Sequence, residues 1–188
     1  NTYNTVQIGY QLWMKENLKT AKYNNGDAIP NVTDATEWVS LTTGAYADYD
    51  NNPDNSIIYG KMYNWYTVNN SNGICMEGWH IPSQDEGRIL IDYLVDNVGG
   101  KMKSTGTIEG GDGLWYSPNE EATNESGFSG LPAGRRFGSP VVGWAGTYID
   151  LGNNGTLWTS SESSSELHTQ GIGQHLYYNG NSLGLSVE

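Results

Sequence analysis

The stretch that decides the fold is "GWHIPSQDE", residues Gly78 to Glu86, which brings a histidine, a serine and two carboxylates close together in the chain. Ser83 and Glu86 have the S-x-x-E spacing of a capping box, in which the serine hydroxyl accepts from the third helical amide and the glutamate accepts from the cap amide. Pro82 precedes the cap, and Asp85 and Glu86 place negative charge at the positive end of a helix. The pattern therefore predicts the start of a helix rather than an active site.

Apolar residues continue this helix at the expected spacing: Ile89, Leu90, Tyr93 and Leu94. The pair Gly99-Gly100 follows, and paired glycines commonly end a helix. We therefore predict one clear helix over about residues 83–97. Gly87 stands in its first turn, where a glycine lowers helix stability, and the sequence offers no reason for it.

The chain before this helix is read as a hairpin followed by loops. "VQIGYQLWMKENL" alternates apolar and polar residues around Gly9-Tyr10, which predicts two strands joined by a tight turn. Residues 23–56 are rich in Asn, Asp, Thr, Gly and Pro and are predicted to form long loops. Residues 59–70 form a short helix or a buried strand, and a helical turn is favoured by the spacing of Met62, Trp65 and Tyr66.

The chain after the helix is read as β structure. "GLWYSPN", "SGFSGLPAGRR", "GWAGTYI", "TLWTSSES" and "HLYYNG" are short aromatic or apolar pieces divided by Gly, Asn, Ser and Pro. "NNG" before Thr156 is a strong turn signal. We predict a single α+β domain over residues 1–188, trimmed at both ends, with small antiparallel sheets, one clear helix and long ordered loops.

The composition bounds the class of protein and its partners. In 188 residues there are 25 Gly, seven Trp and 13 Tyr but only two Phe, which indicates a core built from amphipathic aromatic side chains. The formal net charge of −12 repels phosphate and anionic lipids, so we expect no nucleic-acid partner. No apolar run approaches the ~20 residues that span a bilayer, so we expect no membrane insertion of this domain. Cys75 is the single cysteine and allows no internal disulfide.

A candidate metal site lies in "DYDNNPD", where every second residue supplies an oxygen ligand, as in calcium loops: Asp48, Asp50, Asn52 and Asp54. Pro53 stands where the EF-hand pattern has its glycine, and Tyr59 occupies the twelfth position in place of glutamate. The alternative is a polar loop whose side chains cap its own backbone turns. Calcium is the one cofactor that the sequence suggests.

Catalytic motifs are sparse. His80, His168 and His175 lack the spacing of zinc ligands, and we expect His80 to be a packed side chain that bonds a backbone carbonyl. No G-x-S-x-G elbow occurs, and no neighbouring residue type activates the Cys75 thiol. A glycosidase with paired carboxylates stays open, because four glutamates could converge in space: Glu120, Glu121, Glu162 and Glu166.

The candidate ligand-binding residues are aromatic side chains with polar neighbours: Trp115, Trp144, Tyr148 and Trp158. Aromatic rings stack on the apolar faces of sugars, and nearby amide and hydroxyl groups fix the orientation. The alternative is that most of these rings form the core, because Leu, Ile and Val are few. The pair Arg135-Arg136 either bridges carboxylates inside the fold or lies beside a ligand groove, and we favour the structural role.

Seven segments occur in the order expected of one family: "NTYNTVQIGYQLWMKENLKT", "YNNGDAIPNVTD", "YGKMYNWYTV", "GWHIPSQDE", "GGKMKSTG", "ATNESGFSGLPAGRR" and "LWTSSES". Together they resemble the Fibrobacter succinogenes major paralogous domain, found in secreted proteins and lipoproteins of Fibrobacter and Bacteroidetes. The resemblance covers nearly the whole chain and implies a C-type-lectin-like fold. "IPSQDE" also resembles the "LPT-x-x-E" helix start of formylglycine-generating-enzyme-like domains.

The departures from this family bear on function. Gly87 stands where the family usually has an aromatic residue. The family usually has an Arg-Cys pair after its final strand, and the cysteine of that pair would be the natural partner of Cys75. This sequence lacks the pair. "WTSSES" lacks the Trp-Asn-Asp calcium ligands of sugar-binding C-type lectins, and no Glu-Pro-Asn or Gln-Pro-Asp loop occurs. The single Cys75 does not supply the nucleophiles of formylglycine-generating enzymes.

The resemblance implies a non-catalytic module that is secreted or held at the outer cell surface, lipid-anchored through a removed N-terminal segment. We expect an adhesin-like module that binds an extracellular carbohydrate or a protein partner, with its oligomeric state open. One alternative is a structural module of the cell envelope without a small ligand, which predicts a flat apolar patch. The other is a glycoside-acting enzyme, which predicts two carboxylates in a cleft, one with a raised pKa.

Overall fold

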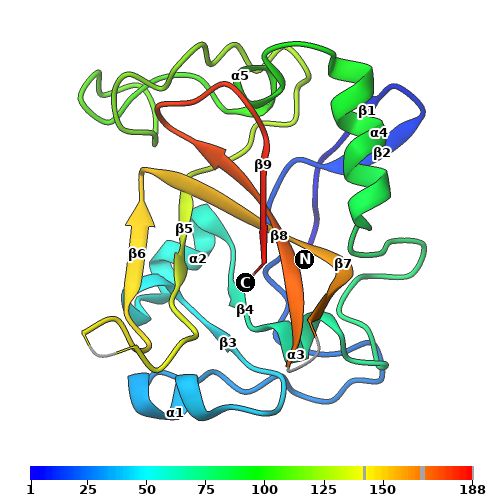
Figure 1. The fold of residues 1–188 in the computed structure, drawn as a ribbon, viewed down its shortest axis with the longest axis vertical. Helices are drawn as coiled ribbons and strands as arrows, with labels where there is room; N and C mark the ends of the chain where they lie inside the picture. The colour runs from blue at the N-terminus through cyan, green and yellow to red at the C-terminus, as the bar shows by residue number, and fades with distance from the viewer. Residues whose placement is uncertain (142, 166–167, 188) are drawn as a thin grey trace.

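The computed structural model describes residues 1–141, 143–165 and 168–187, without the side chains of residues 164–165, 168–170 and 187. Its main sheet has the strand order β6-β5-β7-β8-β9 (Figure 1). β5 pairs in parallel with β7, and the other neighbours are antiparallel. The five strands are β5 (Ala133–Arg136), β6 (Tyr148–Leu151), β7 (Asn154–Ser165), β8 (His168–Tyr177) and β9 (Gly184–Val187). With its small sheets and short helices the fold is mixed α+β, as predicted, but the expectation of purely antiparallel sheets is wrong, because β5 and β7 run parallel.

β5 separates two strands that follow each other in the chain. β6 and β7 lie on opposite sides of β5, and only residues 152–153 connect them. Gly134 and Gly155 face each other across β5 and β7. An added Cβ at either glycine would lie 2.4 Å from a backbone oxygen. The crossing therefore requires glycine at both positions, because a side chain at either would collide with the neighbouring backbone. The predicted turn before Thr156 lies here.

The N-terminal hairpin is confirmed. β1 (Thr5–Ile8) pairs with β2 (Gln11–Met14), and Ile8 opposite Gln11 leaves Gly9-Tyr10 as a two-residue turn. A second small sheet joins β3 (Tyr46–Ala47) to β4 (Met62–Tyr63), and α3 (Trp65–Val68) follows it. The segment 59–70 thus contains both a buried strand and the predicted helical turn.

The capping box is also confirmed. α4 (Gln84–Leu94) begins after Ser83, whose hydroxyl accepts from the Glu86 amide at 3.2 Å, while the Glu86 carboxylate accepts from the Ser83 amide at 2.7 Å. The helix buries Gly87, Leu90 and Leu94. A Cβ at Gly87 would lie 1.8 Å from the Gln174 side chain, so close packing against β8 explains this glycine.

The predicted end of this helix is wrong. α4 stops at Leu94, and Val95 takes a positive φ of 67°. Gly99 and Gly100 lie inside a second helix, α5 (Val98–Met102), instead of ending the first. A Cβ at either would come within 2.6 Å or less of a backbone oxygen in another segment. Their role is close tertiary packing rather than termination.

The prediction of loops over residues 23–56 is also wrong in part. This region contains α1 (Ala35–Ser40), β3, the 3₁₀ turn η1 (Tyr49–Asn51) and the start of α2 (Pro53–Tyr59). The Asp34 side chain caps α1 by accepting from the Glu37 amide at 2.8 Å, and Asn52 caps α2 in the same way from Asp54 at 3.1 Å. Short helices form because side chains of this loop-like composition satisfy the first helical amides.

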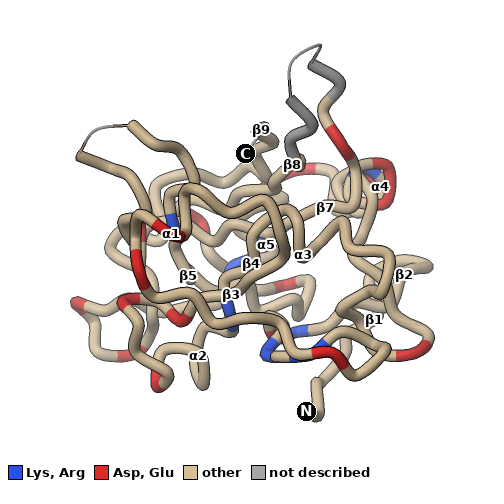
Figure 2. Tube along the Cα trace, turned by 90° about the horizontal axis from the view of Figure 1, so that it is seen from below, with Lys and Arg blue, Asp and Glu red and all other residues tan. Residues whose placement is uncertain are grey.

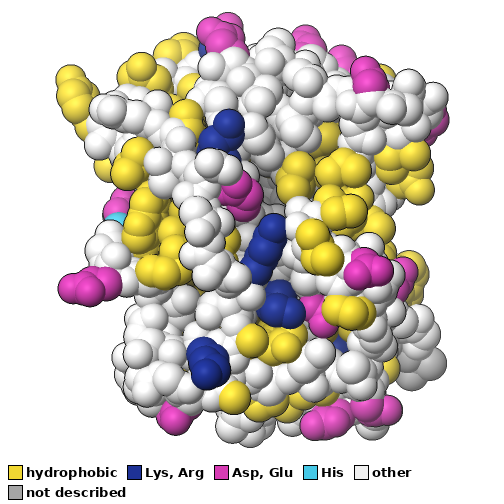
Figure 3. Space-filling model, turned by 180° about the vertical axis from the view of Figure 1, so that it is seen from behind, with side chains coloured by type: hydrophobic (Ala, Val, Ile, Leu, Met, Phe, Trp, Pro, Cys, Tyr) yellow, Lys and Arg dark blue, Asp and Glu magenta, His cyan; other side chains and the backbone are white. Residues whose placement is uncertain are grey.

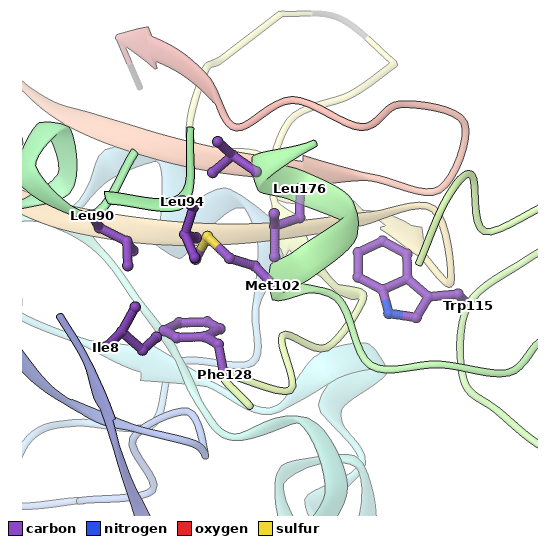
Figure 4. Packing of buried hydrophobic residues seen from close by; sticks show 8 residues of the cluster. Ile8, Leu90, Leu94, Met102, Trp115, Phe128 and Leu176 are labelled. Carbon is purple, nitrogen blue, oxygen red and sulfur yellow. The ribbon is translucent and has the colours of Figure 1, made fainter. Parts of the chain in front are cut away.

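The main core lies between α4, α5 and the sheet (Figure 4). Figure 4 shows Ile8 and Phe128 facing Leu90 and Met102, with Trp115 at the far end of the cluster. Residues 113–119, predicted as a strand, belong to no named strand, and Trp115 makes only an isolated bridge to Thr107. The full buried cluster comprises Ile8, Leu90, Leu94, Val98, Met102, Trp115, Phe128 and Leu176.

Lys103 lies in this interior with no exposed surface. Its ammonium donates to the carbonyl oxygens of Glu120, Tyr177 and Gly180 at 2.8, 2.9 and 2.9 Å. Burial lowers the pKa of Lys103 to about 8. One side chain therefore ties the end of α5 to the loop after Trp115 and to the end of β8.

The charges are unevenly distributed. Carboxylates lie mostly along the outer turns of the trace, while several Lys and Arg residues lie nearer the middle (Figure 2). Within the described residues, no helix has the length and apolar character needed to cross a membrane.

Candidate functional site

A cleft of about 1500 Å³ lies between the N-terminal half of the chain and the main sheet. Its walls come from β2, from residues 59–68 and 78–82, and from β5, β7 and β8. Figure 3 shows the rear face of the molecule hollowed near its centre, with apolar side chains on both sides of the hollow. Because large clefts lined by apolar and aromatic side chains commonly bind ligands, we treat this cleft as the candidate functional site.

One wall of the cleft is a pair of tryptophans. The rings of Trp65 and Trp158 lie 5.7 Å apart at 45°, and the Trp158 indole donates to the Tyr63 carbonyl at 2.7 Å. A Cβ at Gly171 would lie 2.3 Å from Trp65, so β8 approaches the pair only because this residue is glycine. Tyr66, on the next position of α3, also lines the cleft and is 46% exposed.

Trp13 and Trp79 also line the cleft. Trp13, from β2, packs edge-on against Phe128 with ring centroids 6.0 Å apart. Trp79 packs against the smaller core cluster that contains Cys75. Aromatic side chains thus face the cleft from separate segments, although hairpin, loop and sheet are distant in sequence.

Gln174 is the most unusual polar residue of the cleft. It projects from β8 with 2% exposure, and its amide nitrogen has no hydrogen-bond partner among the described residues. An unsatisfied buried donor is costly, so native structures rarely retain one without a bound partner. Its segment, "GIGQHLYY", carries no sequence signal that this glutamine would be buried.

The rim of the cleft holds a small acid–base group. The His80 ring lies 2.8 Å from the Glu86 carboxylate, which also accepts from the Ser83 amide and hydroxyl. Burial alone would raise the pKa of Glu86, but these hydrogen bonds hold it below its usual value. The expectation that His80 is packed and bonds a carbonyl is wrong: its side chain is 70% exposed and pairs with the glutamate.

The structure does not assemble the predicted calcium loop. The buried Asp48 carboxylate binds the Lys61 ammonium at 2.8 Å and accepts from the Ser56 hydroxyl, while Asn52 caps α2. Burial opposes ionisation of Asp48, yet these partners hold its pKa below the usual value. Asp50 and Asp54 are exposed, and the described residues contain no group of three or more His, Cys, Asp or Glu suited to a metal. The Lys61 ammonium already neutralises the Asp48 carboxylate, which a bound calcium ion would need as a ligand.

Arg136 has the structural role that we favoured, by a different route. Instead of bridging carboxylates, its guanidinium donates to the carbonyls of Gly146, Val32 and Thr33 at 3.0, 2.5 and 2.9 Å. It also lies over the rings of Trp38 and Tyr148, at 4.6 and 4.7 Å from their centroids. Arg135 does approach a carboxylate, at 3.5 Å from Asp150.

The predicted ligand-binding aromatics do not form one site. Trp115 is fully buried in the main core, so its assignment to a sugar-stacking surface is wrong. Tyr148 is half-buried, with its hydroxyl on Asn51 at 2.6 Å and its ring beside Arg136. Trp144 is 54% exposed but is not part of the cleft wall. Only Trp158 lines the cleft.

Of the four glutamates considered for catalysis, two hold hydrogen bonds at the surface and Glu120 is not part of the cleft lining. Glu121 accepts from Asn181 at 2.9 Å and Glu162 from Asn69 at 2.6 Å, at the surface, while Glu166 lies outside the described residues. Cys75 is buried and unpaired, and burial raises the pKa of its thiol to about 11. The His168 side chain also lies outside the described residues.

Comparison with known proteins gives one match. A family model described as the Fibrobacter succinogenes major domain matches residues 6–187. No curated protein and no solved structure matches the chain.

Proposed function

The chain belongs to the Fibrobacter succinogenes major domain family, and from this premise we propose that it is a non-catalytic, carbohydrate-binding module of an exported bacterial protein. The proposed location is the outer cell surface or the medium, with or without a lipid anchor. The proposed fold type is C-type-lectin-like, supported by the capped α4 beside small sheets and long ordered segments. The observation that carries the proposal is the aromatic cleft.

The size of the cleft favours a chain of sugars over a single one. Its volume of about 1500 Å³ exceeds the ~300–1000 Å³ of ordinary small-molecule pockets. Tryptophan and tyrosine side chains that line the cleft offer rings to the C–H faces of successive sugars. An oligosaccharide would therefore lie along the cleft between the Trp65–Trp158 pair and Trp79.

The polar groups of the cleft suit sugar hydroxyls. The unpartnered amide nitrogen of Gln174 is buried beside Gly87, and a sugar hydroxyl that reached it would remove the cost of ~1–3 kcal/mol for an unsatisfied buried donor. Asn64 and Asn154 also line the cleft, with their amide nitrogens bonded to the Thr43 carbonyl and the Asp150 carboxylate. Few polar groups in a mostly apolar site are the usual arrangement for fixing ligand orientation.

A glycosidase is the less favoured alternative. The carboxylates that line the cleft are Glu16 and Glu86. Glu16 holds the Asn4 amide groups at 2.8 and 2.7 Å, and the pKa of Glu86 is lowered by Ser83 and His80 against the effect of its burial. A general acid for glycoside hydrolysis needs the opposite shift.

The test is a binding screen of soluble oligosaccharides by calorimetry and by thermal unfolding. A ligand that binds the native state raises the midpoint. Tyr66→Ala removes an exposed ring that lines the cleft and should weaken binding by about tenfold, because stacking contributes on the order of 1–2 kcal/mol. Tyr116→Ala removes a similarly exposed ring outside the cleft wall and is the matched control.

Two results would count against the proposal. One is the absence of binding to every neutral and acidic oligosaccharide tested. The other is a sugar whose affinity falls equally in the Tyr66 and Tyr116 variants, because then the cleft is not the site.

A further inference from the structure

A second surface, which adjoins the proposed sugar site at Tyr10, exposes large apolar side chains around the hairpin turn and α4. Tyr10 is fully exposed at 102%, Tyr93 at 59% and Ile89 at 53%. We name these three residues the hairpin–helix surface. Val95, at 78%, continues the exposed apolar residues past the end of the helix. Single exposed apolar residues are ordinary, whereas a cluster of large ones marks an interaction site.

The three residues are neighbours. The Tyr93 ring lies against Gly9, since a Cβ there would be 2.9 Å from it, and the Gln11 amide donates to the Glu86 carbonyl at 3.0 Å. The hairpin turn therefore runs along α4 from its first turn to its third. Ile89 and Tyr93 are four residues apart on the helix and share one face. Figures 1 and 2 both show β1 and β2 beside α4.

The surface is flanked by carboxylates. Exposed Asp85, Asp92 and Asp96 lie on or just after α4; Arg88 pairs with Asp85 at 2.9 Å and Lys101 pairs with Asp96 at 2.8 Å, so carboxylates outnumber the cations here. A groove of about 440 Å³ opens beside Tyr93, between β1 and the end of α4, and both Glu125 and Lys101 line it. An incoming side chain therefore finds an apolar surface, a groove and an acidic border.

We propose that the hairpin–helix surface is a docking site for a protein segment whose apolar side chains are flanked by Lys or Arg. The apolar residues of such a segment would cover Tyr10, Ile89 and Tyr93, and its cations would meet the acidic border. A second copy of this chain fits poorly because each carries a net charge of −12. An anionic membrane is repelled by the same charge.

The probe is a pair of synthetic amphipathic helical peptides with identical leucine positions, one with lysine and one with glutamate at the polar positions. Binding to the whole chain is followed by fluorescence anisotropy, and the surface is mapped by amide NMR shifts. We expect the lysine peptide to bind more tightly and to shift α4 and the hairpin turn. Ile89→Lys should weaken it about tenfold or more, as for an interface anchor, and Asp92→Asn by about two- to threefold.

Ile57→Lys is the matched control, because Ile57 is 68% exposed on α2, a different helix. Equal loss in the Ile89 and Ile57 variants, or equal binding of the two peptides, would overturn the proposal. So would concentration-dependent dimerisation, or binding to vesicles of anionic lipid, that Ile89→Lys abolishes. If Ile89→Lys does not fold, Tyr10→Ser removes a fully exposed side chain at the same surface and takes its place.

Discussion

Replacing Lys103 with methionine tests whether one buried ammonium holds three chain segments together. Methionine keeps most of the apolar stem but leaves the carbonyls of Glu120, Tyr177 and Gly180 without their donor. Each stranded buried acceptor costs about 1–3 kcal/mol, so the loss is roughly 6 kcal/mol in total.

The variant also avoids the free-energy cost of burying a charged ammonium, which destabilises the folded wild type. Burial lowers the pKa of Lys103 from 10.5 to about 8, which corresponds to roughly 3 kcal/mol against the charged form at neutral pH. Subtracting this cost, we expect Lys103→Met to lower the free energy of unfolding by roughly 3 kcal/mol at pH 7.

The same residue predicts a pH dependence. Because the folded pKa lies below the unfolded value, the unfolded chain binds more protons between about pH 8 and pH 10.5, and the wild type gains stability as the pH rises through that window. The methionine variant lacks this gain, so the difference between the two proteins should widen. Urea unfolding followed by tryptophan fluorescence at pH 7 and pH 9.5 measures both effects.

The control for this experiment is Lys22→Met, at an exposed lysine, which should leave stability nearly unchanged at both pH values. Equal stability of wild type and Lys103→Met at pH 7 would refute the role of the three carbonyl contacts. A difference that stays constant or narrows with rising pH would refute the inferred cost of burying the charge.

Three further outcomes are expected. Arg136→Lys keeps a charge but loses the planar fork that reaches three carbonyls between two rings, so thermal unfolding should show a loss of about 2 kcal/mol that Arg88→Lys does not. The pKa of Asp48 is lower in the folded protein than its unfolded value of 3.8, so the stabilisation from its ionised form is present above pH 3.8 and is lost as the pH falls through the folded pKa. Asp48→Asn should therefore make the free energy of unfolding depend less steeply on pH in the acid range. An unchanged pH dependence in that range would contradict this role of Asp48. Calcium and EDTA should leave the unfolding midpoint of the wild type unchanged, since Lys61 occupies the Asp48 carboxylate, and a rise with calcium would restore the metal loop as a hypothesis.

The features predicted correctly from sequence depend on neighbours in the chain. Ser83 and Glu86 form their capping box within three residues, and Gly9-Tyr10 makes its turn from two. Such contacts need no knowledge of the rest of the fold. The same locality explains an error: Gly99-Gly100 has the pattern of a helix end, but its role is set by oxygens of Ser182 and Glu121 that only the tertiary structure supplies.

The site residues were the least predictable, because burial decides their role. Trp115 and Trp158 look alike in sequence, yet one lies in the core and the other lines the cleft. Lys103, in "GGKMKSTG", has the composition of a surface segment and is fully buried. Asp48 has the spacing of a calcium ligand in sequence, but Lys61, which directly precedes β4, neutralises its carboxylate.

The strand crossing at β5 makes the two ends of β6 differ in how much length variation they tolerate. The N-terminal end of β6 follows a long connection with exposed residues such as Val141 and Gly143, where extra residues would extend into solvent. Its C-terminal end is joined to β7 by residues 152–153 alone, over a strand packed through bare glycine backbone. An insertion there would detach β7 from β5, and with it β8 and β9. Affinity tags, fluorophores and circular permutations belong at the first connection and not at the second.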